Sequence, residues 1–168
     1  RLGEHAFRVL ADTAAEVDGK EQDAMFGVLC RNLCSVVSAQ GAALASFLFL
    51  PGEVELQAVV GGGHTVDLSC LPSRRKAVSE AWLASVMAQD VKTCRPHRDC
   101  LVTLFGTDLE RLLPPGGVCH RLSCVRNGRL LLTGLVSLPA EIHHNQRRAL
   151  SAYMGLAGVI VERAEAVE

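Results

Sequence analysis

The sequence has few aromatic residues, no long apolar run and no excess of charge of either sign. Only 4% of its 168 residues are aromatic, with one Trp and one Tyr. Seventeen basic side chains balance 18 acidic ones, for a net charge of −1, which argues against the basic surface typical of nucleic-acid-binding domains. The longest apolar run, residues 42–50, contains Ser46 and is far shorter than the ~20 residues that span a bilayer. We therefore expect neither nucleic-acid binding nor membrane insertion in this segment.

Familiar catalytic motifs are also missing. Gly61-Gly62-Gly63 is not followed by the Lys-Ser/Thr pair of a phosphate-binding loop. The chain has no nucleophile elbow and no Ser/His/Asp grouping, and no pair of carboxylates stands in a catalytic setting. These absences favour binding over catalysis, and we expect this domain not to be an enzyme.

The composition is that of one folded domain. Apolar residues make up 49% of the chain and charged residues 21%, and the length fits a single core. The chain begins at Arg1, so we expect residues 1–168 to be one domain of a longer protein. Its seven cysteines are an odd number, which does not suit the paired disulfides of small secreted domains. We therefore expect free thiols and a cytoplasmic location.

Apolar spacing predicts helices at both ends of the chain and in its middle. Residues 1–39 show three- and four-residue spacing and predict two helices, and residues 143–166 predict a closing helix. Residues 77–89 predict a further helix with Ser73 as its candidate N-cap. Thr107-Asp108-Leu109-Glu110 fits the capping box of a short helix.

Strand patterns occupy residues 42–138. Asn127-Gly128 tolerates the positive φ angles of a type I′ turn and predicts a tight hairpin. A second hairpin turns at Pro51-Gly52-Glu53. The predicted strands are residues 42–50, 53–60, 91–94, 118–125 and 130–138. The two kinds of element together predict an α+β domain.

Three stretches resemble GAF domains, the small-molecule-sensing modules of signalling proteins. Residues 29–50, LCRNLCSVVSAQGAALASFLFL, are similar to that family's second helix and first strand. Residues 118–138, VCHRLSCVRNGRLLLTGLVSL, are similar to its hairpin, and residues 149–164, ALSAYMGLAGVIVERA, to its closing helix. The resemblance implies a GAF-like antiparallel β-sheet, with N- and C-terminal helices on one face and pocket-forming loops and helices on the other.

The chain departs from the family in two places. Residues 122–124 are Leu-Ser-Cys where the family commonly carries Pro, and the middle helix has Ala77, Ala81 and Ala84 where the family is often rich in Gly. The resemblance therefore carries over a fold but no particular class of ligand.

The resemblance also implies a pocket, with walls from residues 61–75 and 82–118. These segments and the strand that follows them contain the apolar, aromatic and polar groups expected of a small-molecule site. Trp82 suits a core or pocket-wall position as well as a ligand contact. The candidate ligand-binding residues are His64, Trp82, Cys94, His97, Cys100 and His120.

Cys94-x-x-His97-x-x-Cys100 leaves a metal or haem site open as an alternative. Thiolate and imidazole are ligands for zinc and copper, although the spacing is not the two close doublets of a structural zinc site. Haem would use one of the histidines. The Cys119-His120 pair does not fit covalent haem attachment, because Gly116 stands where a second Cys is needed. The candidate metal ligands are Cys94, His97, Cys100 and Cys119.

A thiol-based redox sensor is a further alternative. Free methionine sulfoxide reductases are similar in fold and use reactive cysteines near the pocket, and Cys94, Cys100 and Cys119 occupy broadly comparable regions. The Gly-Trp and Ser-Glu-Ile motifs of that family are missing here. A noncatalytic redox switch needs fewer special residues than a reductase.

We interpret the chain as a sensory, regulatory domain of a signal-transduction protein, such as a two-component histidine kinase, a cyclic-dinucleotide enzyme or a transcriptional regulator. A small-molecule ligand would shift the population between two arrangements, and the terminal helices would relay the shift to a fused output domain. No cofactor is singled out; haem and zinc stay open. We expect a homodimer through the terminal helices, with contact residues Leu2, Val9, Met154, Ala157 and Val161.

Overall fold

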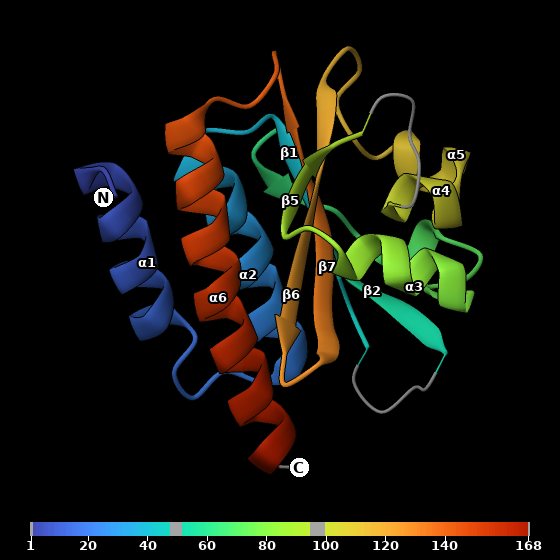
Figure 1. Cartoon of the computed structure of the whole chain (residues 1–168), viewed down its shortest axis with the longest axis horizontal. Helices are drawn as coiled ribbons and strands as arrows, with labels where there is room; N and C mark the ends of the chain where they lie inside the picture. Colours follow the sequence, from blue (N-terminus) through green and yellow to red (C-terminus); the bar gives the residue numbers. More distant parts are fainter. Residues whose placement is uncertain (1, 48–51, 95–99, 168) are drawn as a thin grey trace.

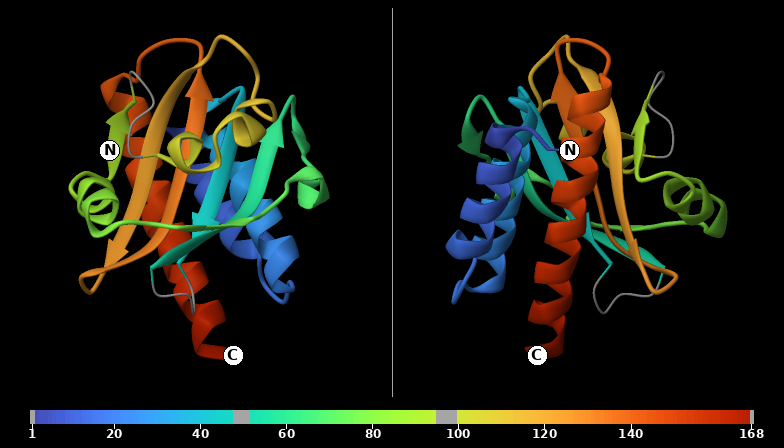
Figure 2. Two further views of the ribbon diagram at one scale, coloured as in Figure 1. Left: turned by 90° about the vertical axis from the view of Figure 1, so that its right-hand side faces the viewer. Right: turned by 60° about the vertical axis from the view of Figure 1, so that its left-hand side comes forward.

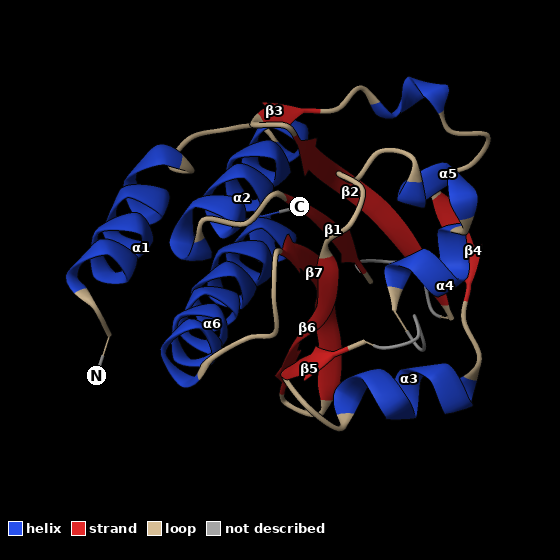
Figure 3. Ribbon diagram, turned by 90° about the horizontal axis from the view of Figure 1, so that it is seen from above, coloured by secondary structure: helices blue, strands red, loops and turns tan. Residues whose placement is uncertain are grey.

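A seven-stranded antiparallel sheet lies between two layers of helices in the computed structural model, which describes residues 2–47, 52–94 and 100–167 (Figures 1 and 3). The strand order is β3-β2-β1-β7-β6-β5, and β4 pairs with β2. The strands are β1 Gly41–Ser46, β2 Glu53–Gly61, β3 His64–Thr65, β4 Arg75–Ala77, β5 Val91–Thr93, β6 Val118–Arg126 and β7 Arg129–Leu138. The α+β architecture expected from the sequence is confirmed.

The terminal helices cover one face of the sheet and the shorter middle helices cover the other (Figure 2). On the first face lie α1 Glu4–Glu16, α2 Gln22–Val37 and α6 His144–Val167. On the second lie the 3-10 helix η1 Leu68–Cys70, α3 Glu80–Met87, α4 Leu101–Phe105 and α5 Thr107–Glu110. Within the described ranges, no helix combines the length and the apolar character that crossing a membrane requires.

Side chains alternate between the two faces along each strand. On β1, Ala42 and Leu44 pack under the terminal helices, whereas Ala43 and Ala45 pack under the middle helices. Both faces are therefore buried, which explains why this strand reads as a continuous apolar run and not as an alternating one.

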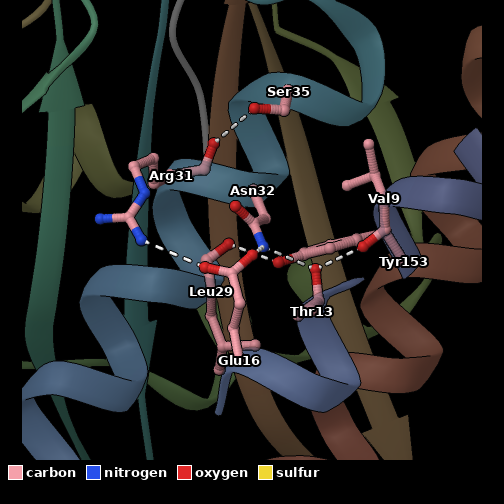
Figure 4. A network of polar contacts seen from close by, with 8 residues as sticks. All are labelled: Val9, Thr13, Glu16, Leu29, Arg31, Asn32, Ser35 and Tyr153. Atoms are coloured by element: carbon pink, nitrogen blue, oxygen red, sulfur yellow. Dashed lines mark hydrogen bonds and ion pairs between the residues drawn. The ribbon is translucent and has the colours of Figure 1, made fainter. Parts of the chain in front are cut away.

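A buried polar network joins α1 to α2, and α2 to α6 (Figure 4). Thr13 Oγ1 donates to the Val9 carbonyl at 2.7 Å and accepts from Asn32 Nδ2 at 2.8 Å. The hydroxyl of Tyr153 donates to the Leu29 carbonyl at 2.7 Å. These partners satisfy polar groups that would be costly to bury alone, so they specify how the three helices dock.

The closing helix α6 is fastened to the sheet near both of its ends. Near its start, Arg147 Nη1 donates to the Val91 carbonyl of β5 at 2.6 Å. Further along, Gly158 lies against Cys124 of β6, where an added Cβ would overlap the Cys124 sulfur. Two ion pairs then join the helix to the β6–β7 hairpin, Arg126–Glu162 at 3.1 Å and Arg129–Glu165 at 2.6 Å.

The middle helix α3 is held on the opposite face by two side chains of β6. Ser123 Oγ donates to the Val86 carbonyl at 2.8 Å, and the guanidinium of Arg121 donates to the Ser85 carbonyl at 3.1 Å. Both bonds reach carbonyls of the last turn of the helix, where the usual intrahelical partners run out.

Two helix starts differ from the sequence prediction. Residues 75–77 form β4, so the helix predicted over 77–89 begins at Glu80, and Ser79, not Ser73, accepts a bond from the Trp82 amide. The pairing of β4 with β2 competes with helix formation here and prevails.

The predicted capping box at Thr107 is also wrong. Helix α5 begins after Gly106, and no side chain caps it. The preceding helix α4, which the sequence pattern did not reveal, starts at Cys100, whose amide donates to Thr103 Oγ1 at 3.3 Å. The predicted strand 42–50 ends at Ser46 in the described part; residues 48–50 and the predicted turn residue Pro51 lie outside it.

Candidate functional site

A cleft of about 510 Å³ lies at one end of the sheet, on the face that carries α4 and α5. Its volume is within the ~300–1,000 Å³ range of small-molecule sites. The walls come from the two short helices, the segment after α5, the start of β6 and the end of β7. The lining residues are Val102, Thr107, Glu110, Arg111, Leu113, Pro114, Pro115, Gly116, Gly117, Cys119 and Ser137.

The segment of residues 112–117 lies directly on the ends of β1 and β2 because glycines leave room for it. A Cβ on Gly41 would come within 2.8 Å of Pro114 Cδ. A Cβ on Gly61 would come within 2.6 Å of the Leu112 carbonyl oxygen, a backbone atom that cannot turn aside. These glycines allow the segment to close the end of the sheet and to form one wall of the cleft.

Ser137 places an unsatisfied hydroxyl in the cleft wall. Its side chain is only 1% exposed, and its Oγ has no hydrogen-bond partner within the described part of the chain. Gly117 lies against this hydroxyl, where any Cβ would overlap it. A buried hydroxyl without a partner costs free energy, so a ligand that satisfies it gains affinity.

Cys119 lies opposite Ser137 in the β6–β7 ladder and lines the same cleft. Burial raises the pKa of the Cys119 thiol to about 11, and negative charge on Cys100 and Glu110 acts in the same direction. The thiol is therefore neutral near pH 7 and is a weak hydrogen-bond donor. Glu110 and Arg111 bring charges of both signs to the exposed rim.

Two further thiols, Cys94 and Cys100, lie next to each other in the same apolar cluster as Cys119. The amide of Cys94 donates to the Cys119 carbonyl at 3.0 Å, which continues the pairing of β5 with β6. Contact with the Cys94 side chain lowers the pKa of Cys100, and the amides of Thr103 and Val102 act in the same direction. The same contact and burial raise the pKa of Cys94.

Of the two segments predicted to form the pocket walls, one lines the cleft and the other does not. Most of the lining residues fall within the predicted segment 82–118, and none falls within 61–75. The middle of this face is filled by apolar side chains from the sheet and from α4 and α5, among them Ala43, Val54, Leu56, Leu101, Phe105, Leu109 and Leu135.

The candidate ligand-binding residues within the described part of the chain do not share one cavity. His64 is exposed on the edge strand β3. Trp82 is buried in a separate cluster with Val86 and Leu130, and its ring centroid lies 6.3 Å from that of Phe47. Trp82 therefore occupies a core position.

His120 lies on the face of the terminal helices, because it alternates with Cys119. Its Nε2 lies 3.3 Å from the Ala140 carbonyl and its Nδ1 lies 3.0 Å from Thr93 Oγ1. A carbonyl only accepts, so Nε2 carries the proton in that contact. Both nitrogens are thereby engaged, away from the cleft, and the ring is not placed to hold haem there. His97 lies outside the described residues.

The candidate metal ligands come together only in part. Among the residues that the structure describes, no group of three or more His, Cys, Asp or Glu side chains has an arrangement that would hold a metal ion. All seven cysteines are free thiols. Cys94 and Cys100 are neighbours, and Cys119 is close enough for charge on Cys100 to raise its pKa.

The candidate dimer contacts are largely interior residues. Val9, Met154, Ala157 and Val161 are buried in the core under the terminal helices, and Leu2 packs against that core. They face the sheet and the neighbouring helices of their own chain, so they do not form an exposed contact surface. A homodimer through other residues of these helices stays a prediction.

The sequence pattern did not mark Ser137, Thr107, Gly116 or Gly117 as residues that line a cleft. The run Pro114-Pro115-Gly116-Gly117 indicated only the end of a helix. Two prolines and two glycines directly before a buried strand are also typical of a rigid segment that approaches a sheet closely, which is the signal that would have pointed to this end of the fold.

The sequence matches no family model and no curated protein, but its structure matches solved ones. The phycocyanobilin-bound GAF domain of a cyanobacterial phytochrome superposes with a TM-score of 0.67 at 10% identity, over 99% of each chain. The A. aeolicus nlh2 GAF domain in an inactive state superposes with a TM-score of 0.65 at 11% identity, over 98% of this chain and 99% of that one. The GAF domain of an Acinetobacter phosphoenolpyruvate-protein phosphotransferase superposes with a TM-score of 0.62 at 9% identity, over 99% of this chain and 98% of that one.

The arrangement of sheet and helices is therefore that of a GAF domain, and the likeness extends over nearly the whole chain. At these identities the likeness defines the fold. The GAF resemblance read from the sequence is confirmed at that level.

Proposed function

We propose that this chain is a small-molecule-sensing module of a signal-transduction protein, with the cleft at the end of the sheet as its ligand site. The observation that carries the proposal is the buried hydroxyl of Ser137, which has no partner in the described structure and forms part of a cleft of about 510 Å³. The GAF fold supports the same interpretation.

The chemistry of the cleft limits the ligand. Leu113 and Val102 offer apolar contact, the Ser137 hydroxyl can donate or accept, and the neutral Cys119 thiol can donate. Glu110 adds a carboxylate at the rim. A small molecule with an apolar body and one polar group directed at Ser137 fits this set.

The strands that line the cleft also lead away from it. At one end of the β6–β7 hairpin, Cys119 and Ser137 face the cleft; at the other end, Arg126 and Arg129 form ion pairs with α6. Two continuous strands and one helix therefore connect the cleft to the C-terminal end of the described chain. A ligand acts through its different affinity for two arrangements of this unit, and α6 would pass the change to a fused output domain.

Ligand-detected and amide NMR with a defined panel of amino acids, nucleotides and 2-oxo acids tests the proposal. A binder from the panel is expected to shift the amide signals of Gly116, Gly117 and Ser137 and then those of Glu162 and Glu165. A panel in which no compound binds, or a binder whose shifts avoid the cleft, would overturn it.

Two tryptophan substitutions on α5 provide a matched control. Thr107→Trp puts a large ring into the cleft from its rim and is expected to abolish binding. Asp108→Trp changes the next residue, which does not line the cleft, and should leave binding unchanged. Equal effects of the two variants would place the ligand elsewhere.

A further inference from the structure

Two side chains of opposite charge lie next to each other on the rim of the cleft. Glu110 is the last residue of α5, Arg111 follows it, and both line the cleft. Both are exposed, and neither side chain forms a hydrogen bond or an ion pair within the described part of the chain. Elsewhere on the surface such charges are paired, as Arg75 is with Glu55 at 3.1 Å. The rim therefore presents one positive and one negative charge to a molecule that enters the cleft.

The order of these two residues along the chain prevents them from satisfying each other. Neighbouring residues of a helix point in different directions, and no ion pair joins Glu110 to Arg111 in the structure. Their Cα atoms are nevertheless only ~3.8 Å apart, so one small molecule can reach both side chains. A molecule that carries both charges on adjacent groups fits this rim.

Deeper in the cleft the polar groups are uncharged. The Ser137 hydroxyl is buried without a partner among the described residues, and the neutral Cys119 thiol lies beside it. Among the residues that line the cleft, Glu110 and Arg111 are the only charged ones at pH 7. Burying an ion beside Ser137 would therefore be costly, whereas an uncharged polar group gains a hydrogen bond there.

We propose that the cleft binds a free α-amino acid whose side chain ends in an uncharged hydrogen-bonding group, a hydroxyl or an amide. The α-carboxylate pairs with Arg111, the α-ammonium pairs with Glu110, and the side chain extends inwards to Ser137. Val102 and Leu113 contact its apolar part. This inference rests on the proposed function, because it names the ligand class of the same cleft.

The charges on the rim also act against other classes of ligand. A 2-oxo acid has a carboxylate for Arg111 but leaves Glu110 facing a second negative group. An amine without a carboxylate is disfavoured in the same way by Arg111. A nucleotide brings its phosphate charge to a rim whose own charges cancel. Like charges placed together are costly, so the pair selects a ligand that carries both signs.

Titration of the chain with L-serine, L-threonine, L-asparagine and L-glutamine, followed by amide NMR, tests the class. At least one of these four amino acids is expected to bind and to shift the amide signals of Gly117 and Ser137. Its deamino and decarboxy analogues, which for L-glutamine are glutaramate and 4-aminobutanamide, should bind about tenfold more weakly, because each leaves one charge of the rim unpaired. L-glutamate should not bind, because its side chain is ionised.

Failure of this inference and failure of the proposed function give different results. If the four amino acids do not bind but a nucleotide or a 2-oxo acid shifts the cleft amides, the amino acid assignment is overturned and the ligand site stands. If no compound shifts the cleft amides, both fall. An amino acid that binds no more tightly than its two analogues, or L-glutamate that binds as tightly as L-glutamine, also contradicts the assignment.

Two charge-removing variants assign the rim residues to the two ends of the ligand. Glu110→Gln should weaken the amino acid about tenfold without weakening its deamino analogue. Arg111→Gln should weaken the amino acid and its deamino analogue without weakening the decarboxy analogue. Asp108→Asn removes a carboxylate from the same helix at a position that does not line the cleft, and it should leave all three affinities unchanged.

This pattern separates direct contact from a structural disturbance. A variant that merely distorts the cleft weakens all three compounds to the same degree, so equal losses in Glu110→Gln or Arg111→Gln would overturn the assigned contacts. Both side chains are exposed, so the variants are expected to fold, and their amide spectra verify this. The wild-type titrations with the analogues decide the ligand class independently of any variant.

Discussion

Cys119 and Ser137 are direct partners in the β6–β7 ladder, and both line the same cleft. They occupy the end of the hairpin that lies farthest from its Asn-Gly turn. This pairing places a protonated thiol and an unsatisfied hydroxyl side by side at the edge of a sheet whose centre is filled by apolar side chains.

Two buried serines on the cleft-side face should respond in opposite ways to removal of their hydroxyls. Ser137→Ala removes a hydroxyl that has no partner among the described residues, so the free energy of unfolding should rise by about 1 kcal/mol. Ser123→Ala removes the 2.8 Å bond to the Val86 carbonyl and should lower it by about 1–2 kcal/mol. Urea unfolding measures both, and equal destabilisation would show that the Ser137 hydroxyl is satisfied.

Substitution of alanine for two glycines of α6 should change the stability of the domain in opposite directions. Gly158→Ala forces a Cβ onto the Cys124 sulfur and should destabilise the domain by about 1–3 kcal/mol, as overpacking does. Gly155 is exposed and has open space around it, so Gly155→Ala should stabilise the helix by about 0.5–1 kcal/mol. Thermal unfolding of the two variants tests this, and a neutral Gly158→Ala would mean that α6 does not lie so close to β6.

The packing of the terminal helices should depend on the buried network and not on surface charge. Tyr153→Phe removes the 2.7 Å bond to the Leu29 carbonyl and should cost about 1 kcal/mol of stability, with faster hydrogen exchange in α2 and α6. Arg8→Gln breaks an exposed ion pair with Glu4 and should change stability by less than about 0.5 kcal/mol. A larger effect of Arg8→Gln would contradict the assigned role of the network.

Stability should fall in alkaline solution because of buried thiols. Burial raises the pKa of Cys34 and of Cys119 from the ordinary 9.0 to about 11. Between these values the unfolded chain has lost thiol protons that the folded chain keeps, so the unfolded state binds fewer protons and the free energy of unfolding decreases as pH rises. The stabilisation is complete below pH 9.0 and is lost towards pH 11.

Urea unfolding in the presence of a reductant, at several values across this range, measures the slope. A Cys34→Ala, Cys119→Ala double variant should have a smaller slope than the wild type. An unchanged slope would show that these two thiols titrate normally in the folded chain. Tyr153, whose pKa is also raised by burial, contributes in the same direction at the upper end of the range in both proteins.

The fold could be predicted because its signals are local. Asn127 and Gly128 take φ angles of 53° and 72°, as the predicted type I′ turn requires, and the apolar spacing of residues 1–39 and 143–166 is enough to define the helical layer. Local spacing does not report long-range pairing, which is why β4 replaced the predicted first turn of α3.

The cleft could not be predicted because it depends on which way each side chain points. His120 and Cys119 are neighbours in sequence, yet one lies under the terminal helices and the other lines the cleft. The register of β6 with β7 shifts between Cys124 and Val125, and that of β1 with β2 shifts between Leu44 and Ala45. Such irregularities, and the contact of residues 112–117 with Gly41 and Gly61, are set by the assembled sheet.

The attachments of α6 to β5 and to the hairpin restrict how that helix can move. Arg147 ties it to Val91 near its start, and Glu162 and Glu165 tie it to β6 and β7 about four and about five turns later. Sliding along the helix axis would stretch all of these links at once, whereas a change in sheet twist would carry both anchor points with it. The structure therefore favours tilting of α6 together with the sheet over translation of α6 along its own axis.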